Sequence, residues 1–326
     1  MSNLFFEGTE KKVELVVSAG APNLRALGQR RWREIVEAAR ANVLSCLTTE
    51  HCDAYLLSES SLFVFERKML MITCGRTRLV DAVAELLKDV APEDVCFLIF
   101  ERKNEVFPHR QPTSFYEDAR ALNELLPGKA MRFGNEDEHH LYLYHLDRAF
   151  DGEPGDVTME ILMYGLDRSA ADLFDLRKGA AAAPARSEAM RRIFPGYRTE
   201  EHLFEPSGYS LNGVHGEHYG TLHVTPQEHG SYASFETNRP FGDDPSALCN
   251  EVLDVFQPRA FDVVLFDQGG GGPFASPAGY TMRAQVTQRI DCGYRVRFLS
   301  HFRPSRGENR PNPIPIEVET LNRGSR

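Results

Sequence analysis

The sequence predicts an α+β fold in which antiparallel sheets are covered by helices. Three observations lead to this prediction: segments of short apolar alternation outnumber amphipathic ones, helices recur singly after groups of strands, and no regular strand–helix alternation runs along the chain. With 326 residues, 42% of them hydrophobic, the chain can bury a large core as one big domain or two modest ones.

The strands are predicted from alternating apolar residues. Val13, Leu15 and Val17 share one face of the first strand. In residues 62–65 both faces are apolar, which predicts a strand lying between two layers. The further predicted strands are residues 69–73, 95–100, 140–144, 159–164, 219–224, 231–236, 261–266 and 294–300.

Four helices are predicted from apolar residues at helical spacing. The first carries its stripe from Trp32 to Val43, and the second carries one over residues 79–87. The third begins at a capping box formed by Ser114 and Glu117 and stops at residues 127–128, a Pro-Gly pair. The fourth spans residues 245–256.

The best linker candidate is residues 179–186, a glycine and four alanines before Pro184. It divides the chain into similar halves, 1–178 and 187–326, and we expect each half to carry one sheet. No internal repeat is detectable in the sequence. The glycine run 269–272 lacks a following Lys-Ser or Lys-Thr, which favours a turn over a phosphate-binding loop.

Composition excludes several classes of function. A net charge of −10 and a pI near 5.6 argue against nucleic-acid binding and suit a cationic small substrate. No apolar run approaches the roughly 20 residues of a membrane span, and the N-terminus lacks a signal-peptide pattern. The six scattered cysteines indicate free thiols in a reducing compartment. We therefore expect a cytoplasmic protein with no membrane contact.

Polar residues interrupt an apolar strand pattern at residues 55–64, where Ser58, Glu59, Ser60 and Ser61 follow one another. Alone, this segment predicts only a polar turn between two strands. Further blocks lie at residues 5–10, 57–61 with 73–75, 208–213, and 223–226 with 234–238. In their sequence, order and spacing these blocks resemble the eukaryotic-type, pyruvoyl-dependent S-adenosylmethionine decarboxylase proenzymes.

The resemblance implies a single decarboxylase domain over residues 1–326 and a four-layer α/β/β/α sandwich, with helices flanking two antiparallel sheets. It implies self-cleavage between Glu59 and Ser60 into chains 1–59 and 60–326. Ser60 attacks the preceding carbonyl and becomes an N-terminal pyruvoyl, so neither pyridoxal phosphate nor a metal is needed. That carbonyl forms an imine with S-adenosylmethionine and accepts the electrons released with carbon dioxide. The product donates aminopropyl groups to spermidine and spermine.

The resemblance also assigns roles to individual residues. Ser210 donates a hydrogen bond during the acyl shift, His223 removes the Cα proton, and Cys74 protonates the decarboxylated carbon. Without the motifs, His223 is an ordinary polar-face residue and Cys74 a small buried one. Further implied residues are Glu7 and Glu10 for processing or catalysis, and Phe6, Glu59, Phe204 and Gln227 for substrate binding, the two phenylalanines stacking on adenine.

The sequence departs from the family at two places. Gln227 occupies the position of a glutamate that commonly binds the ribose, unless a one-residue shift brings Glu228 inward. Five mostly acidic residues match the site at which animal members bind the activator putrescine; they are Glu14, Asp156, Thr158, Glu160 and Glu236. Ile72 replaces an animal lysine, and Lys12 stands where plant members have arginine. We hypothesise that the Lys12 ammonium partly replaces putrescine; otherwise Lys12 is a surface lysine.

Two alternative functions remain open at this point. One is a catalytically inactive regulatory paralogue, which would form a heterodimer with an active decarboxylase. An active enzyme would instead form a homodimer. The other is a pyruvoyl-dependent decarboxylase of another amino acid, such as ornithine or arginine. Gln227 is the residue that points toward a different substrate.

Overall fold

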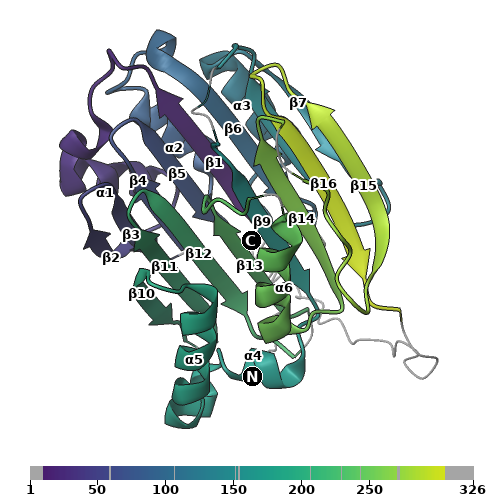
Figure 1. Ribbon diagram of the computed structural model, residues 1–326. Coiled ribbons are helices and arrows are strands. Elements are labelled where there is room, and N and C mark those ends of the chain that lie inside the picture. The colour runs from purple at the N-terminus through teal and green to yellow at the C-terminus, as the bar shows by residue number, and fades with distance from the viewer. Residues whose placement is uncertain are drawn as a thin grey trace, which may run out of the picture.

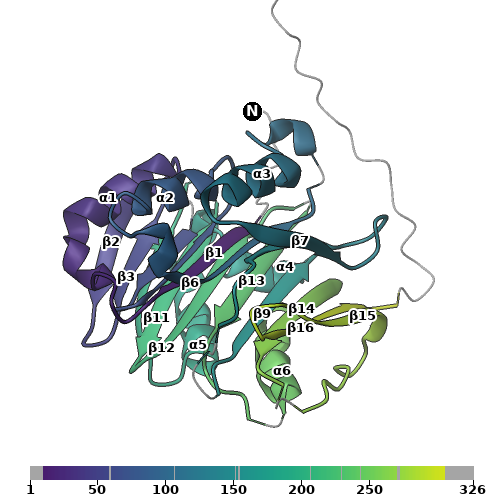
Figure 2. The same cartoon turned by 90° about the horizontal axis from the view of Figure 1, so that it is seen from above.

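The structure is a computed structural model that describes residues 10–304 except 59, 106, 151, 153, 154, 206, 229, 243, 270 and 271. Two eight-stranded sheets face each other, and helices cover the outer face of each sheet (Figure 1 and Figure 2). Every pair of neighbouring strands is antiparallel. The predicted α/β/β/α sandwich is confirmed.

The first sheet is built from residues 11–146. Its strand order is β2-β3-β4-β5-β1-β6-β8-β7, so β1, the first strand along the chain, lies between β5 and β6. The strands are β1 (Lys11–Val17), β2 (Val43–Thr48), β3 (Asp53–Leu57), β4 (Ser60–Val64), β5 (Lys68–Thr73), β6 (Val95–Lys103), β7 (Gly128–Phe133) and β8 (Leu141–Leu146).

The second sheet repeats this plan. Its order is β10-β11-β12-β13-β9-β14-β16-β15, in which each strand holds the place of the strand numbered eight lower in the first sheet. The strands are β9 (Thr158–Tyr164), β10 (Arg198–Leu203), β11 (Tyr209–His215), β12 (His218–Thr225), β13 (Tyr232–Thr237), β14 (Ala260–Asp267), β15 (Thr281–Arg289) and β16 (Arg295–Phe302). The duplication that the sequence did not reveal is visible in the strand order.

Three α-helices cover each sheet (Figure 2). On the first sheet they are α1 (Gly28–Ala38), α2 (Leu79–Leu86) and α3 (Phe115–Leu125); on the second they are α4 (Arg168–Asp172), α5 (Ala183–Ile193) and α6 (Pro245–Phe256). Short 3₁₀ helices span Leu24–Leu27, Pro92–Asp94, Pro108–Arg110 and Leu176–Ala181. The capping box of α3 is present, with Ser114 and Glu117 reciprocally bonded, and α6 has its predicted bounds.

Two expectations about boundaries were wrong. Strand β9 belongs to the second sheet, so the chain changes sheet between β8 and β9 rather than at residues 179–186. Those residues end a 3₁₀ helix and begin α5, because alanine favours helix and Pro184 fits a first turn. Val43, expected at the end of the first helix, lies in β2, since α1 ends at Ala38 and Arg40 (φ 65°) turns the chain.

Three layers of side chains fill the sandwich. One apolar layer lies between each sheet and the helices that cover it. The third layer lies between the sheets and holds an apolar patch at either end. The first patch joins β3–β5 to β11 and β12 and contains Cys52, Ala54, Phe63, Leu70, Ile72, Val214 and Tyr219. The second, which we call the distal apolar patch, contains Phe97, Ile99, Phe133, Leu141, Leu143, Val264, Phe266, Ile290, Cys292, Tyr294, Val296 and Phe298. Among the described helices, none combines the length and the apolar character needed to span a bilayer.

Candidate active site

Ser60, the first residue of β4, sits in a strained backbone conformation. It is 3% exposed and pairs with Leu57 of β3 and Thr73 of β5. Its φ of 140° lies where residues with a Cβ are rare, at a cost of about 1–3 kcal/mol. The strain lies on the C-terminal side of the peptide bond that the sequence predicts to be cut. Glu59, on the other side, lies outside the described residues, as do Phe6 and Glu7.

Cys74 lies at the end of β5, beside Ser60. The two side chains are within reach, with 3.9 Å between Ser60 Oγ and Cys74 Sγ. Thr77 fixes the turn that carries Cys74: its hydroxyl donates to the Cys74 carbonyl at 3.2 Å and lies 2.7 Å from the Thr73 hydroxyl. Gly75, at φ 64°, makes this turn feasible. The structure therefore brings together two of the predicted catalytic residues.

Ser210 and His223 face each other across β11 and β12 of the second sheet. Ser210 Oγ lies 2.9 Å from His223 Nδ1. Burial lowers the pKa of His223 to about 3, so the ring is neutral near pH 7. A neutral imidazole bonded through both nitrogens is held in one orientation and can accept a proton.

A hydrogen-bonded network that the sequence did not predict links Ser61, the residue after Ser60, to the Ser210–His223 pair. Ser61 Oγ, from the first sheet, lies 3.2 Å from His223 Nε2 and donates to Asn212 Oδ1 at 2.5 Å. Thr221 Oγ1 lies 2.9 Å from the same Nε2. Asn212 Nδ2 donates in turn to the Tyr55 carbonyl at 2.9 Å. The signal was available, because Asn212 lies in block 208–213 and Thr221 shares a strand face with His223.

Two of the predicted substrate-binding residues can be located. Phe204 is half-buried in the loop after β10, where its N–H donates to the Gly208 carbonyl at 2.9 Å. Gln227 is partly buried after β12, whereas Glu228 is exposed. The alternative in which Glu228 turns inward is therefore wrong, and Gln227 is the more buried of the two side chains.

A buried charged cluster lies in the middle of the layer between the sheets. Lys12, which is 2% exposed, reaches Glu160 at 2.5 Å and both Glu101 and Glu236 at 3.3 Å. The expectation of a surface lysine is therefore wrong. Glu101 was not predicted, because it stands in the polar end of an apolar strand. We call Lys12, Glu101, Glu160 and Glu236 the acidic cluster.

The acidic cluster holds more carboxylates than its lysine can balance. Burial raises the pKa of Glu101 and of Glu236 to about 7 and that of Glu160 well above its usual range. Burial alone would lower the pKa of Lys12, but the surrounding carboxylates raise it well above 10.5. Glu101 is held in the cluster by its 3.3 Å ion pair with the same lysine that pairs with Glu160 and Glu236. The cluster therefore shares protons near neutral pH.

The remaining predicted acids surround this cluster. Glu14 pairs with Lys68 at 2.8 Å, and Asp156 accepts a hydrogen bond from Tyr294. Thr158 is buried at the start of β9. Burial raises the pKa of Glu10, which precedes β1, to about 7.

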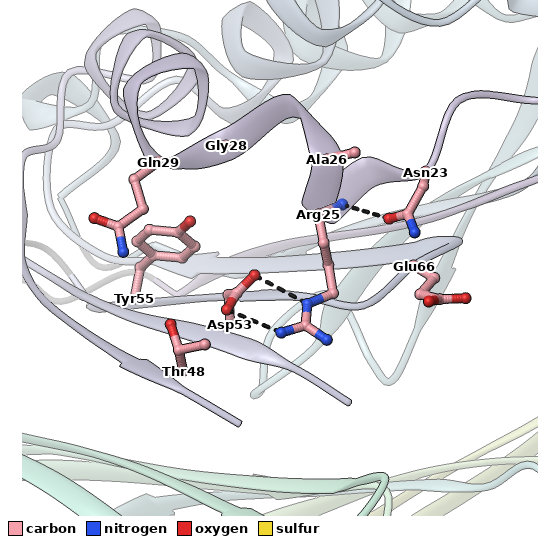
Figure 3. Close-up of a pocket in the computed structure, with 9 residues that line it drawn as sticks. All are labelled: Asn23, Arg25, Ala26, Gly28, Gln29, Thr48, Asp53, Tyr55 and Glu66. Carbon is pink, nitrogen blue, oxygen red and sulfur yellow. Dashed lines mark hydrogen bonds and ion pairs between the residues drawn. The ribbon is translucent and has the colours of Figure 1, made fainter. Parts of the chain in front are cut away.

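A cavity of about 480 Å³ lies elsewhere, between the segment that begins α1 and the outer face of β3 (Figure 3). Its lining residues are Asn23, Arg25, Ala26, Gly28, Gln29, Thr48, Asp53, Tyr55 and Glu66. The Arg25 guanidinium pairs with Asp53 at 3.0 Å, which neutralises its charge. None of Ser60, Cys74, Ser210 and His223 lines this cavity, so it is not the candidate active site. The described residues also contain no group of His, Cys, Asp and Glu side chains arranged to hold a metal ion.

Comparison with known proteins agrees with this geometry. A model of the adenosylmethionine decarboxylase family matches residues 3–300. This chain belongs to that family. An S-adenosylmethionine decarboxylase proenzyme of Dictyostelium discoideum is 32% identical over 97% of this chain and 91% of the relative. The proenzyme of Xenopus laevis is 36% identical over 80% of this chain and 83% of the relative. The structure of a Trypanosoma brucei AdoMetDC-delta26 monomer, 26% identical, aligns with a TM-score of 0.59 over 75% of this chain and 99% of that one.

Proposed function

We propose that this protein is a proenzyme that cuts itself between Glu59 and Ser60 and then decarboxylates S-adenosylmethionine, supplying aminopropyl groups for polyamine synthesis. The observation that carries the proposal is the contact between Ser61 Oγ and His223 Nε2, at 3.2 Å. It places a neutral histidine of one sheet against the residue that follows Ser60 in the other.

Cleavage begins at Ser60. Its hydroxyl oxygen attacks the carbonyl carbon of Glu59, the C–N peptide bond breaks as the C–O bond forms, and the nitrogen takes up the hydroxyl proton. The peptide bond becomes an ester. The φ of 140° supports this step, because breaking the peptide link relieves about 1–3 kcal/mol of backbone strain. Ser210 is the donor that we assign to the developing oxyanion.

Elimination follows at the Cα of Ser60. His223 takes the Cα proton, the Cβ–Oγ bond of residue 60 breaks, and Glu59 keeps that oxygen and leaves with a terminal carboxylate. Water hydrolyses the resulting enamine through its imine tautomer, releasing ammonia and leaving a pyruvoyl group at residue 60. The hydroxyls of Thr221 and Ser61 hold His223 Nε2 at 2.9 and 3.2 Å, which supports its role as a fixed base.

The residues around Ser60 fit a pyruvoyl group. Bound at residue 60, its carbonyl supplies an electron acceptor, so no lysine and no pyridoxal phosphate is required. Ser60 is 3% exposed, which excludes bulk water from the reacting carbon. Cys74, whose sulfur lies 3.9 Å from Ser60 Oγ, is placed to protonate the substrate carbon that has lost carbon dioxide.

The substrate assignment depends on the names of the relatives and on the charge of this chain. A net charge of −10 attracts a sulfonium cation. We assign the adenine to Phe204, with Phe6 as its partner, and the ribose to Gln227, whose amide replaces a carboxylate acceptor. A cytoplasmic location is part of the proposal, because none of the six cysteines forms a disulfide.

A denaturing mass measurement tests the proposal. Two fragments, 1–59 and 60–326, with pyruvoyl at residue 60 are expected, followed by carbon dioxide release from S-adenosylmethionine. A chain that stays intact supports the inactive regulatory paralogue instead. Release from ornithine or arginine, but not from S-adenosylmethionine, supports the other alternative. The two contacting pairs, Ser60 with Cys74 and Ser210 with His223, favour an active enzyme, because an inactive partner has no need of all four residues.

We further propose that Lys12 acts as a built-in cation in place of putrescine. Its ammonium already sits within 3.3 Å of three buried carboxylates, where a diamine would otherwise place its charge. Turnover and cleavage should therefore change little on addition of putrescine. The Lys12→Met variant should become dependent on putrescine. A large stimulation of the unmodified protein would refute the proposal.

A further inference from the structure

Lys11 is a second buried lysine in β1, and the mechanism above does not use it. Because neighbours in a strand point to opposite faces, its side chain lies on the helix-covered face while Lys12 lies between the sheets. Lys11 is 1% exposed. Its Nζ donates to the Gly75 carbonyl at 2.7 Å and to Gln111 Oε1 at 2.9 Å. Both partners are uncharged oxygens.

The charged groups around Lys11 come from three elements. Arg102 of β6 lies opposite Lys11 in the strand register. It forms ion pairs with Asp118 of α3, at 2.5 Å, and with Glu105. These acids are therefore already engaged by a guanidinium. Cys74, in the turn after β5, is a further ionisable neighbour. Burial, reinforced by Arg102, lowers the pKa of Lys11 to about 8, against the opposing effects of Cys74, Asp118 and Glu105. At pH 7 the lysine is still mostly protonated.

Burying a charged lysine among uncharged acceptors lowers the stability of the fold, which indicates that the charge serves a function. The Gly75 carbonyl that Lys11 holds belongs to the residue immediately after Cys74. In the sheet register, Lys11 pairs with Thr73, and Thr73 pairs with Ser60. The ammonium is thus fixed to the turn that places the Cys74 sulfur beside Ser60.

We propose that Lys11 is a positioning residue for Cys74: it anchors the Cys74–Gly75 turn and its positive charge stabilises the thiolate formed when Cys74 delivers its proton. This inference rests on the proposed function, in which Cys74 is the proton donor. In that step the S–H bond breaks, a C–H bond forms at the substrate carbon, and the electron pair stays on sulfur. Water later returns the proton to the thiolate, and Lys11 keeps its own proton throughout.

The test reads the thiol directly, without turnover. In a Ser60→Ala background, which cannot form the prosthetic group, the rate of Cys74 alkylation by iodoacetamide is measured against pH, with peptide mass spectrometry to separate Cys74 from the other cysteines. Removing a neighbouring cation should raise the midpoint of this profile by about one pH unit in Lys11→Gln and Lys11→Met. Lys11→Arg, which keeps the charge, should stay nearer the parent. The control is Lys88→Met, because the Lys88 side chain is 66% exposed.

The variants separate the two parts of the role. Lys11→Gln keeps a hydrogen-bond donor and is the variant to read if Lys11→Met does not fold. In the processed enzyme, Lys11→Gln should lower kcat roughly tenfold with KM unchanged, which corresponds to the same shift of about one pH unit. An unchanged alkylation midpoint in Lys11→Gln overturns the inference. Failure of the proposed function would appear separately, as an unprocessed or inactive parent with Ser60 intact.

Discussion

The layer between the two sheets contains two regions built on the same scaffold with opposite chemistry. The distal apolar patch joins β6 and β8 to β14 and β16 with apolar side chains. The reactive region joins β1, β4 and β6 to β9, β11, β12 and β13 with buried polar and charged side chains, from Ser61 and His223 to the acidic cluster. Burying apolar area stabilises the sandwich, whereas burying charges costs free energy that their pairing rarely recovers. The stability of the sandwich and its reactive groups therefore depend on neighbouring parts of one interface.

The sharpest test of this division removes the chemistry and leaves the interface. Ser60→Ala should abolish cleavage and all decarboxylase activity, since it removes the attacking hydroxyl, and the neighbouring Ser61 hydroxyl is engaged by Asn212 and His223. Its thermal unfolding should stay close to that of unprocessed parent protein, because the distal apolar patch is untouched. Denaturing electrophoresis and calorimetry measure the two effects. Any cleavage at residue 60 in this variant would contradict the assignment.

Removing the base should trap the reaction halfway. His223→Ala should slow release of the fragments by about 10²- to 10⁴-fold, the usual contribution of a positioned base. If the ester accumulates, hydroxylamine should cut this variant at residue 59 but should not cut Ser60→Ala. His301→Ala is a matched control, because His301 is a buried histidine of the same sheet that stacks on Phe261 away from the site. Equal slowing in both variants would argue for a general structural effect.

Opening the distal apolar patch should do the reverse. Phe298 is 1% exposed in this patch, and Phe298→Ala should lower the free energy of unfolding by about 3–5 kcal/mol. Once folded at low temperature, the variant should still cleave itself, since the reactive region is intact. Chemical denaturation and a cleavage time course give the two readings. Loss of cleavage in folded protein would show that the two regions are coupled.

The smallest expected effect is a pH dependence that originates in the acidic cluster. Glu101 and Glu236 have folded pKa values of about 7, above the ordinary value of 4.5, so the folded state binds more protons between these limits. Their contribution to stability is therefore present at pH 4.5 and is lost as the pH rises through 7. Lys12 stays charged throughout this window and adds no slope. Calorimetry should find a lower Tm at pH 8 than at pH 5.

The Glu101→Gln variant sharpens this prediction. Removing one carboxyl whose pKa is raised from 4.5 to about 7 should reduce the loss of stability between pH 5 and pH 8 by roughly 2–3 kcal/mol, about 4 °C in Tm for a chain of this size. The control is Glu93→Gln, because Glu93 is an exposed residue in the 3₁₀ helix Pro92–Asp94. An unchanged slope in Glu101→Gln would mean that the cluster does not titrate in this range.

The sequence predicted the parts of this molecule that depend on local periodicity. Four helices, α1, α2, α3 and α6, and most of the central strands follow from spacing alone, and α6 was predicted with its bounds. Helices α4 and α5 were missed, because α4 has only 5 residues and α5 begins in the alanine run that was interpreted as a linker. The edge strands β2, β7, β10 and β15 were missed, because a strand that packs on one side only needs few apolar residues; β10 is almost entirely exposed. The two remaining misses, β3 and β11, lie inside the polar blocks that were interpreted as motifs.

The candidate site divides in the same way. Ser60, Cys74, Ser210 and His223 were found through motifs, and the structure brings them together as two pairs, Ser60 with Cys74 and Ser210 with His223. Ser61 and Asn212 could not be assigned a contact from sequence, since their bond joins residues 151 positions apart in different sheets. Lys11 and Glu101 were missed because a charged residue at a strand end is usually solvated. Only the register shows that both side chains point into the protein.

The central place of β1 determines what cleavage leaves behind. A cut after residue 59 places β1, β2 and β3 in the short polypeptide. Strand β1, however, is hydrogen-bonded along both edges to strands of the long polypeptide, β5 and β6. The short polypeptide can dissociate only if the strand pairing in the middle of the first sheet is broken. The nicked molecule should thus melt in one transition as a single cooperative body, and maturation changes its covalent connectivity without creating a separable subunit.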